Sequence, residues 1–393
     1  MNWIELREYE PVYLEQEKLA VEDALRLLHS YDGKITVEFP SPKSNYCWIL
    51  RSMGVVGYLP LNEKKGLYLK PKVPIHNVYM MLSYSYELND VLFLEEHVEC
   101  ETLQEVYELL ALKLARQVLK RTKNGIYREY QEQREELPYL RGRMDVQQAM
   151  RQPWNPKLTC EFEEHQADIE DNHILYWTLY KILQSGFIQE RNLPLVRRAY
   201  RGLQPFVNLQ KVTYQLCLNR LYNRLNLDYK PMHLLCLLFL QNIGPTHQIG
   251  ETKSVPFLID MAALFERFVA KLLANHLPFP LQLNAQEHIT IGKHKEIQFF
   301  IDLVILDSQT REVKYVLDTK YKTHEKPSAS DVSQVVTYAL AKDCNEAILI
   351  YPSKETVPIN EYIGDIKVKS CVIDISNDLE KCRQEIMEVI RIN

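Results

Sequence analysis

The pattern of apolar and polar residues predicts a β-hairpin in the C-terminal third of the chain. Residues 297–306 and 313–320 are two mainly apolar runs, rich in β-branched and aromatic side chains. The polar stretch 307–312 separates them, as a turn would. We therefore expect two adjacent strands, whose side chains alternate between the two faces of a sheet.

Further periodic segments surround this hairpin. Apolar residues recur at helical spacing before and after it, and two short apolar runs follow. The expected elements are helices over 257–275, from about residue 327 and from about residue 378, and strands over 347–351 and 369–375. Together with the hairpin, they predict a mixed α/β core over residues 251–393.

The first 250 residues divide into a β-rich and a helical region. Residues 1–74 hold short strand-like runs between Gly, Pro, Ser and Asn turns, with one helix near 20–30. Residues 75–250 are mainly helical and contain a hairpin-like insertion over 125–162. The expected strands are 35–39, 46–50, 55–59 and 67–69, and the expected helices are 75–87, 102–121, 172–185, 190–202, 208–224 and 232–242. We therefore predict an α+β multidomain protein with domains over 1–74, 75–250 and 251–393.

Composition favours a folded, cytoplasmic protein. Hydrophobic residues make up 46% and charged residues 25% of the chain, as in ordinary globular proteins. No apolar window is long enough to span a bilayer, and the N-terminus lacks a signal-peptide pattern. The eight cysteines are scattered without a Cys-x-x-Cys pair. We expect reduced thiols, no zinc site and no membrane partner.

The net charge of −5 means that any affinity for DNA must come from local basic surface. A basic cluster of this kind is more often an ordinary solvated face. The candidate clusters are Lys64, Lys65, Lys70 and Lys72; Arg116, Lys120, Arg121 and Lys123; Arg141 and Arg143; and Arg197, Arg198 and Arg201.

Two carboxylates interrupt the predicted hairpin. Asp302 lies within an apolar run, and Asp318 lies two residues before Lys320. Strands disfavour Asp, and burying a lone charge is costly, so a divalent cation would offset the cost. If the register sets Asp302 opposite Asp318, both carboxylates and Lys320 converge. Such oxygen ligands suit Mg²⁺, with Mn²⁺ as an alternative, and the lysine could orient water near a scissile phosphate.

An Asp followed by Asp-x-Lys is the PD-(D/E)xK nuclease pattern; an ordinary hairpin with an exposed ion pair is the alternative. The backbone carbonyl of Thr319 is a further candidate ligand. Glu266, on the preceding helix, could face the metal or solvent. Gln334 and Tyr338 are four residues apart and share one helical face. Their position after the lysine strand resembles that in RecB-like nucleases, where the pair helps to place the DNA strand and the lysine.

Several blocks follow one another along the chain: residues 69–84, 140–145, 171–175, 261–269, Asp302 and 318–322. In sequence and order they resemble the McrC family, the nuclease subunit of modification-dependent McrBC restriction systems. The resemblance spans about residues 60 to 350. It departs from the usual pattern at Ile301, which precedes Asp302 in place of proline, and at His173, where arginine is common.

The resemblance implies a Mg²⁺-dependent DNA endonuclease subunit that docks on McrB, a GTP-hydrolysing AAA+ ring, and stimulates it. The chain has no Gly-x-x-x-x-Gly-Lys-[Ser/Thr] phosphate loop of its own, which fits this subordinate role. Self-association through the nuclease domain is a further expected interaction. Two alternatives stay open: a stand-alone PD-(D/E)xK nuclease of repair or transposition, and a catalytically silent adaptor of an AAA+ motor.

Overall fold

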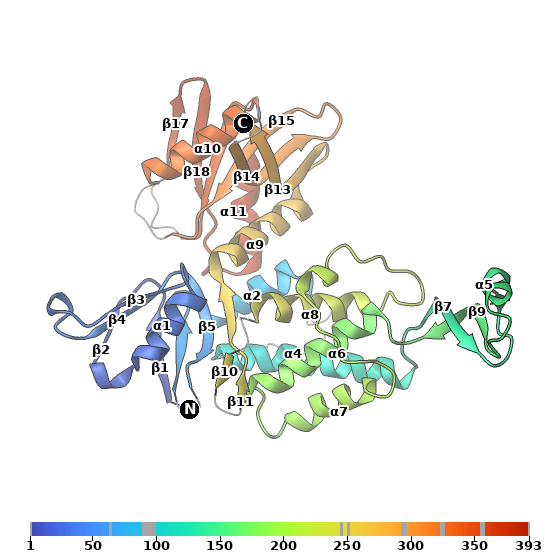
Figure 1. Ribbon diagram of the computed structural model, residues 1–393. Coiled ribbons are helices and arrows are strands. Elements are labelled where there is room, and N and C mark those ends of the chain that lie inside the picture. The colour runs from blue at the N-terminus through green and yellow to red at the C-terminus, as the bar shows by residue number, and fades with distance from the viewer. Residues whose placement is uncertain are drawn as a thin grey trace. The chain divides into compact units, whose positions relative to one another are not determined.

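The computed structural model describes residues 2–62, 65–88, 100–243, 247–249, 252–291, 297–322, 327–353 and 358–391. The chain forms two compact units (Figure 1). Unit 1 combines Met1–Leu103 with Gly244–Asn393, and unit 2 is Gln104–Ile243. The two ends of the chain therefore share one unit. The division into three domains, over residues 1–74, 75–250 and 251–393, stays a prediction.

Two sheets build the N-terminal part of unit 1. In the four-stranded sheet, β1-β6-β5-β12, β1 and β6 are parallel and the other neighbours antiparallel. The second sheet, β2-β4-β3, is antiparallel. The elements are β1 (Asn2–Arg7), β2 (Val12–Leu14), α1 (Val21–Ser30), β3 (Ile35–Glu38), β4 (Trp48–Ser52), β5 (Val55–Pro60), β6 (Lys65–Lys70), α2 (Ile75–Ser85) and β12 (Phe257–Asp260). The expected strands and helix are present, and β1 and β2 are additional.

Strand β12 reaches this sheet from far along the chain. Phe257 pairs with Tyr58 and Asp260 with Val55. The helix predicted from residue 257 was therefore wrong over its first four residues, because a short apolar run fits a buried strand equally well. The helix α9 (Met261–His276) starts after Asp260, whose side chain accepts hydrogen bonds from two backbone N–H groups of the first turn.

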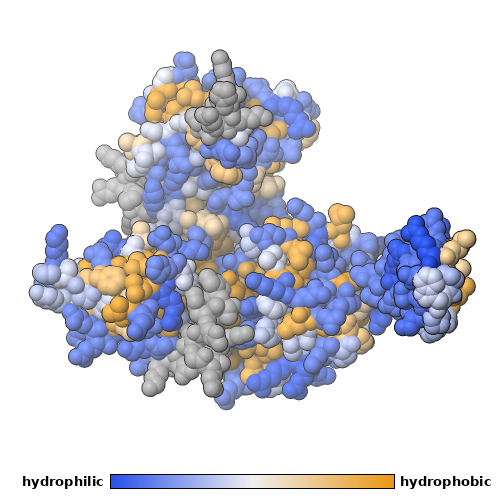
Figure 2. All heavy atoms as spheres, in the orientation of Figure 1, coloured by the Kyte–Doolittle hydropathy of each residue, from blue (hydrophilic) through white to orange (hydrophobic). Residues whose placement is uncertain are grey.

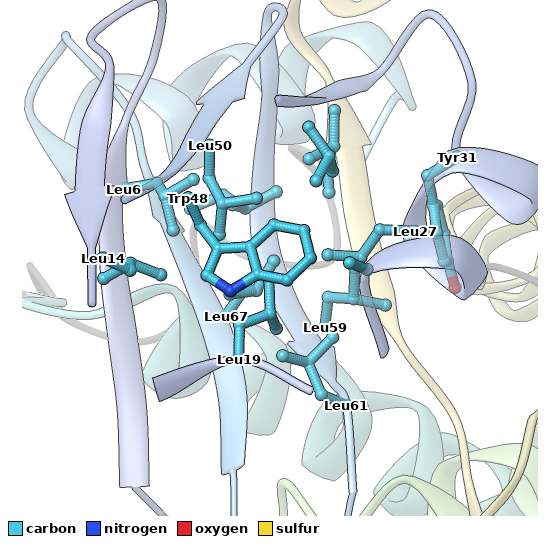
Figure 3. Packing of buried hydrophobic residues seen from close by; sticks show 14 of the residues in the cluster. Leu6, Leu14, Leu19, Leu27, Tyr31, Trp48, Leu50, Leu59, Leu61 and Leu67 are labelled. Atoms are coloured by element: carbon cyan, nitrogen blue, oxygen red, sulfur yellow. The ribbon is translucent and has the colours of Figure 1, made fainter. Parts of the chain in front are cut away.

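Trp48 lies at the centre of the N-terminal core. Leucines from β1, β5, β6 and α1 surround its indole ring (Figure 3). Its side chain is almost wholly buried. Burying such a large aromatic surface contributes about 2–3 kcal/mol relative to exposure, so this core supports both N-terminal sheets.

A six-stranded mixed sheet forms the C-terminal part of unit 1, in the order β13-β14-β15-β16-β18-β17. Strands β13, β14 and β15 are antiparallel neighbours, β15, β16 and β18 are parallel, and β17 is an antiparallel edge. The elements are β13 (Leu281–Ile291), β14 (Ile297–Asp307), β15 (Val313–Thr319), α10 (Ala329–Ala341), β16 (Glu346–Tyr351), β17 (Asn360–Ile363), β18 (Ile366–Val372) and α11 (Leu379–Arg391). The predicted hairpin, inner strands and helices are present, whereas the two edge strands were missed.

Unit 2 consists of helices and a β-hairpin arm that extends from them (Figure 1). The arm contains three strands in the order β7-β9-β8, as the predicted insertion implied. The elements are α4 (Leu103–Lys123), β7 (Glu129–Leu137), β8 (Arg143–Met144), α5 (Val146–Arg151), β9 (Leu158–Gln166), α6 (Glu170–Ser185), α7 (Leu193–Leu203) and α8 (Tyr229–Asn242). None of the helices described in either unit is long and apolar enough to cross a membrane.

The helix predicted over 208–224 is wrong. Only Tyr214–Cys217 forms a short 3₁₀ turn there. Side chains hold the segment in irregular form instead: the Asn208 amide donates to Asp168, and Arg220 donates to Asp171 at 2.5 Å. Tertiary contacts of this kind override an apolar periodicity that would suit a helix.

Candidate active site

Strands β14 and β15 bring two aspartates together. Their register pairs Leu303 with Leu317. Continued by one residue, it aligns Asp302 with Asp318, the condition that the sequence argument required. Asp302 Oδ2 accepts hydrogen bonds from both the backbone N and the hydroxyl of Thr319, each at 3.0 Å. The end of β15 therefore fixes the carboxylate that projects from β14.

Asp318 lies in a buried, acidic setting, and Asp302 beside it is half-buried. Asp318 is only 1% exposed. Its pKa is raised to about 6, first by burial and then by the nearby charge of Asp302, while Lys320 acts in the opposite direction. Removing a carboxylate from water favours its neutral form, so a nearby cation helps to keep Asp318 ionised.

Glu266 belongs to the same electrostatic neighbourhood. It lies on α9, and its pKa is raised by burial and then by the charges of Asp302 and Asp318. Its Oε1 accepts a hydrogen bond from the Gln286 amide at 3.3 Å. The structure therefore places Glu266 where its charge is felt by the aspartate pair.

A chain of polar contacts runs from Asp318 to helix α10. Lys320 Nζ lies 2.6 Å from Asp318 Oδ2 and donates a hydrogen bond to Gln334 Oε1 at 2.9 Å. The Gln334 amide in turn donates to the Tyr338 hydroxyl at 2.7 Å. The structure thus brings Gln334 and Tyr338 together with Lys320, as their spacing on one helical face predicted.

A second ion pair fastens α10 beside these residues. Lys322 Nζ lies 2.9 Å from Asp331 Oδ1, and Asp331 is almost fully buried. The Ser328 hydroxyl caps the helix by accepting a hydrogen bond from the Asp331 backbone N. This contact was not predicted from the sequence. Asp331 in the first turn of an apolar helix, after a lysine-rich strand end, was its only signal.

The donor set fits a hard divalent cation. Asp318 Oδ2 is buried and faces Lys320 Nζ at 2.6 Å. One lysine cannot balance the charges of two neighbouring carboxylates, and a divalent cation would add to the compensation. No group of three His, Cys, Asp or Glu side chains in the described ranges has metal-site spacing. Two carboxylates and the Thr319 carbonyl would suit Mg²⁺, which usually retains several waters.

Glu8 was not anticipated from the sequence. It follows β1 and is fully buried. Its Oε2 accepts hydrogen bonds from the Lys72 backbone N at 2.9 Å and from the Tyr321 hydroxyl at 3.3 Å. Burial raises the pKa of Glu8 to about 7. Because Tyr321 directly follows Lys320, this buried carboxylate contacts the strand end that carries the candidate lysine.

The comparisons with known proteins agree with this architecture. The described residues form an α+β protein with several sheets, whose mixed C-terminal sheet carries a buried aspartate, a half-buried aspartate and a lysine. The model of the family described as McrBC 5-methylcytosine restriction system component matches residues 50–352. The chain therefore belongs to that family, which confirms the resemblance of the sequence blocks. No curated protein matches the chain.

Two solved structures are similar to the chain. One is a chain of the refined half-complex from the tetradecameric assembly of Thermococcus gammatolerans McrB AAA+ hexamers with bound McrC. It is 19% identical with a TM-score of 0.59, and the match covers 99% of this chain and 100% of that one. At this identity the match establishes the fold alone. A chain of the cryo-EM structure of the T. gammatolerans McrBC complex is 21% identical, with a TM-score of 0.46 and coverage of 70% and 88%.

Proposed function

We propose that the chain is the Mg²⁺-dependent DNA endonuclease subunit of an McrBC-type restriction system in the cytoplasm. One observation carries this proposal: Asp302, Asp318 and Lys320 converge where the end of β15 meets the middle of β14, as in a PD-(D/E)xK core. The burial of Asp318 makes an exposed surface ion pair a poor account of this arrangement. Metal-assisted phosphodiester hydrolysis accounts for all three residues.

Each residue has a distinct task in this proposal. Asp302 and Asp318 would hold the cation, and the two hydrogen bonds from Thr319 would orient Asp302. A bound Mg²⁺ would stabilise the negative charge that develops on the phosphate. Lys320, held between Asp318 and Gln334, would orient the attacking water. Cleavage should leave a 5′-phosphate and a 3′-hydroxyl.

Family membership supports an AAA+ GTPase of the McrB type as the partner. The T. gammatolerans structure that matches the fold was solved with McrB AAA+ hexamers. In this chain, the end of the unit 2 arm exposes large hydrophobic side chains among hydrophilic ones (Figure 2). These are Tyr139, Leu140, Val146, Met150 and Trp154. Exposed apolar clusters rimmed by polar residues mark protein interaction sites, so we place the partner contact on this arm.

Within the arm, two of the basic residues noted in the sequence, Arg141 and Arg143, have different surroundings. Arg141 is occupied within the arm, since it pairs with Glu164 at 3.0 Å and its guanidinium lies 3.9 Å from the centre of the Phe162 ring. Arg143, in contrast, is exposed. A neighbouring subunit can supply an arginine that stabilises nucleotide charge in a motor. Arg143 is therefore the better candidate for stimulating GTP hydrolysis.

The test combines the chain with its AAA+ partner, GTP, Mg²⁺ and DNA, and measures cleavage and GTP hydrolysis together. The proposal predicts that Asp302→Ala, Asp318→Ala and Lys320→Ala each abolish cleavage and retain stimulation of the partner. Cleavage without any partner would favour the stand-alone nuclease. Stimulation without cleavage by the unaltered chain would favour the silent adaptor. Self-association through the C-terminal core stays a separate prediction.

A further inference from the structure

Two segments of unit 2 carry many basic residues and no acidic ones. Residues 109–128 contain six lysines and arginines, and residues 191–227 contain seven. Neither segment contains Asp or Glu, although the whole chain has a net charge of −5. Positive charge is therefore concentrated in unit 2 against an acidic background.

Helical geometry arranges these charges in rows. On α4, Lys113, Arg116, Lys120 and Lys123 follow one another at intervals of three or four residues and so share one face. The last three of them are exposed. On α7, Arg197, Arg198 and Arg201 are exposed, while the apolar residues Val196, Ala199 and Leu203 are buried.

The two helices run side by side in the same direction. Near their first turns, Glu108 on α4 accepts a hydrogen bond from the Asn192 amide, just before α7, at 2.9 Å. At the other end, a Cβ placed on Gly202 of α7 would lie 3.6 Å from the Thr122 side chain of α4. Lys123 follows Thr122 directly, and Arg198 lies one turn before Gly202, so the basic rows approach each other at this end.

In the described residues, carboxylates do not neutralise most of the positive charges in these rows. Arg121 and Arg220 are engaged, since Arg121 pairs with Asp228 and Arg220 with Glu170 and Asp171. Within the part of the chain that the structure describes, no carboxylate pairs with the side chains of the following residues: Lys120, Lys123, Arg197, Arg198 and Arg201. We call these five residues the α4/α7 basic surface.

We infer that the α4/α7 basic surface binds the phosphate backbone of duplex DNA. The inference rests on the proposed function, because it takes DNA as the substrate of the C-terminal core. A cationic row gains affinity by releasing the counterions condensed on DNA.

The side chains of α4 and α7 themselves favour DNA over an acidic protein as the occupant. Stable protein interfaces have an apolar centre. None of the exposed large hydrophobic side chains in the described residues lies on these two helices; those nearby, such as Phe206 and Leu225, lie on the segment after α7, and others lie on the arm. Backbone contacts position DNA without reading its bases, so this surface should bind duplexes of any sequence or methylation state equally.

The test measures binding of the full-length chain to a short labelled duplex, in EDTA so that cleavage does not enter. The test variant combines Lys120→Gln, Arg198→Gln and Arg201→Gln. The control combines Lys34→Gln, Lys43→Gln and Lys381→Gln, which removes the same charge from exposed positions of unit 1. Affinity is measured over a series of salt concentrations, and circular dichroism checks that both variants are folded.

We expect the test variant to lose roughly tenfold or more in affinity at low salt, and its salt slope to fall by up to about 2.7, since each lost phosphate contact lowers it by about 0.9. The control should bind like the unaltered chain. Equal losses in both variants would overturn the inference, because net charge alone would then matter. Unchanged DNA binding with lost binding to the AAA+ partner would also overturn it and make the surface a protein contact. A failure of the proposed nuclease activity would be seen in a cleavage assay. The present experiment measures only DNA binding, so the two failures can be told apart.

Discussion

The hydroxyl of Tyr321 donates a hydrogen bond to the carboxylate of Glu8 at 3.3 Å, although 313 positions separate the two residues. Tyr9 reinforces the contact, because its hydroxyl donates to the Tyr321 backbone oxygen at 3.4 Å. Tyr321 immediately follows Lys320. The start of the chain is therefore bonded to the strand end that presents the candidate lysine, within one compact unit.

This contact predicts a pH-dependent stability. The pKa of Glu8 is about 7 in the folded protein, mainly because of burial, against an ordinary value of 4.5. The folded state thus holds the proton more tightly than the unfolded state. The stabilising contribution of this group is complete below pH 4.5 and is lost as the pH rises through 7. Its size is of order 1–3 kcal/mol.

Urea unfolding between pH 5 and about 8 checks this prediction. Glu8→Gln should remove much of the fall in unfolding free energy with rising pH, because a glutamine cannot ionise. Glu10→Gln is the matched control, since Glu10 is exposed in the same segment. A Glu8→Gln variant with the pH profile of the unaltered chain would show that Glu8 does not titrate as described.

The contacts of α10 predict a graded effect on catalysis. Tyr338→Phe removes the hydroxyl that accepts from Gln334, and Gln334→Leu removes the acceptor for Lys320. Both should slow DNA cleavage about 10- to 100-fold, as losses of supporting hydrogen bonds around metal sites do. Stimulation of the partner's GTP hydrolysis should not change.

Ser333→Ala serves as the control on the same helix, because Ser333 is exposed and its hydroxyl donates to the Ala329 backbone oxygen. Single-turnover cleavage rates at saturating Mg²⁺ distinguish the variants. Equal cleavage rates for Tyr338→Phe and Ser333→Ala would contradict the prediction that Tyr338 supports Lys320 in catalysis.

The side chains of the arm predict that binding of the AAA+ partner and stimulation of its GTP hydrolysis depend on different residues. Met150→Ala combined with Trp154→Ala should weaken the complex with the AAA+ partner by about 2–3 kcal/mol or more, because both side chains are 77% exposed and available to a partner. Arg143→Ala should leave the complex intact and reduce GTP hydrolysis. Pull-down affinity and hydrolysis rate, measured on the same samples, separate the two effects. If the Arg143→Ala variant still stimulates GTP hydrolysis fully, Arg143 does not act in the nucleotide site of the partner.

Features carried by neighbouring residues were predictable from the sequence. The β14–β15 hairpin followed from two apolar runs on either side of a polar turn, and its register then set Asp302 and Asp318 together. Gln334 and Tyr338 followed from their four-residue spacing. These inferences succeeded because strand and helix periodicities are local properties.

Features that depend on distant segments were not predictable. Strand β12 pairs with β5, some 200 positions earlier, and the apolar run itself fitted either a strand or a helix. Glu8 gave no local signal of burial, because its partners Lys72 and Tyr321 come from elsewhere in the chain. The irregular segment around Arg220 has helical periodicity, but contacts with Asp171 determine its course.

The most direct test of the central claim is a Mg²⁺ titration of DNA cleavage. The chain, its AAA+ partner and GTP are combined, and cleavage is compared for the unaltered chain and Asp318→Asn, which keeps the shape of the side chain and removes its charge. The account predicts cleavage that rises with Mg²⁺ and a rate lowered by roughly 100-fold or more in the variant, because two carboxylates are needed to hold the cation. Mg²⁺-dependent cleavage by Asp318→Asn at the unaltered rate would contradict it.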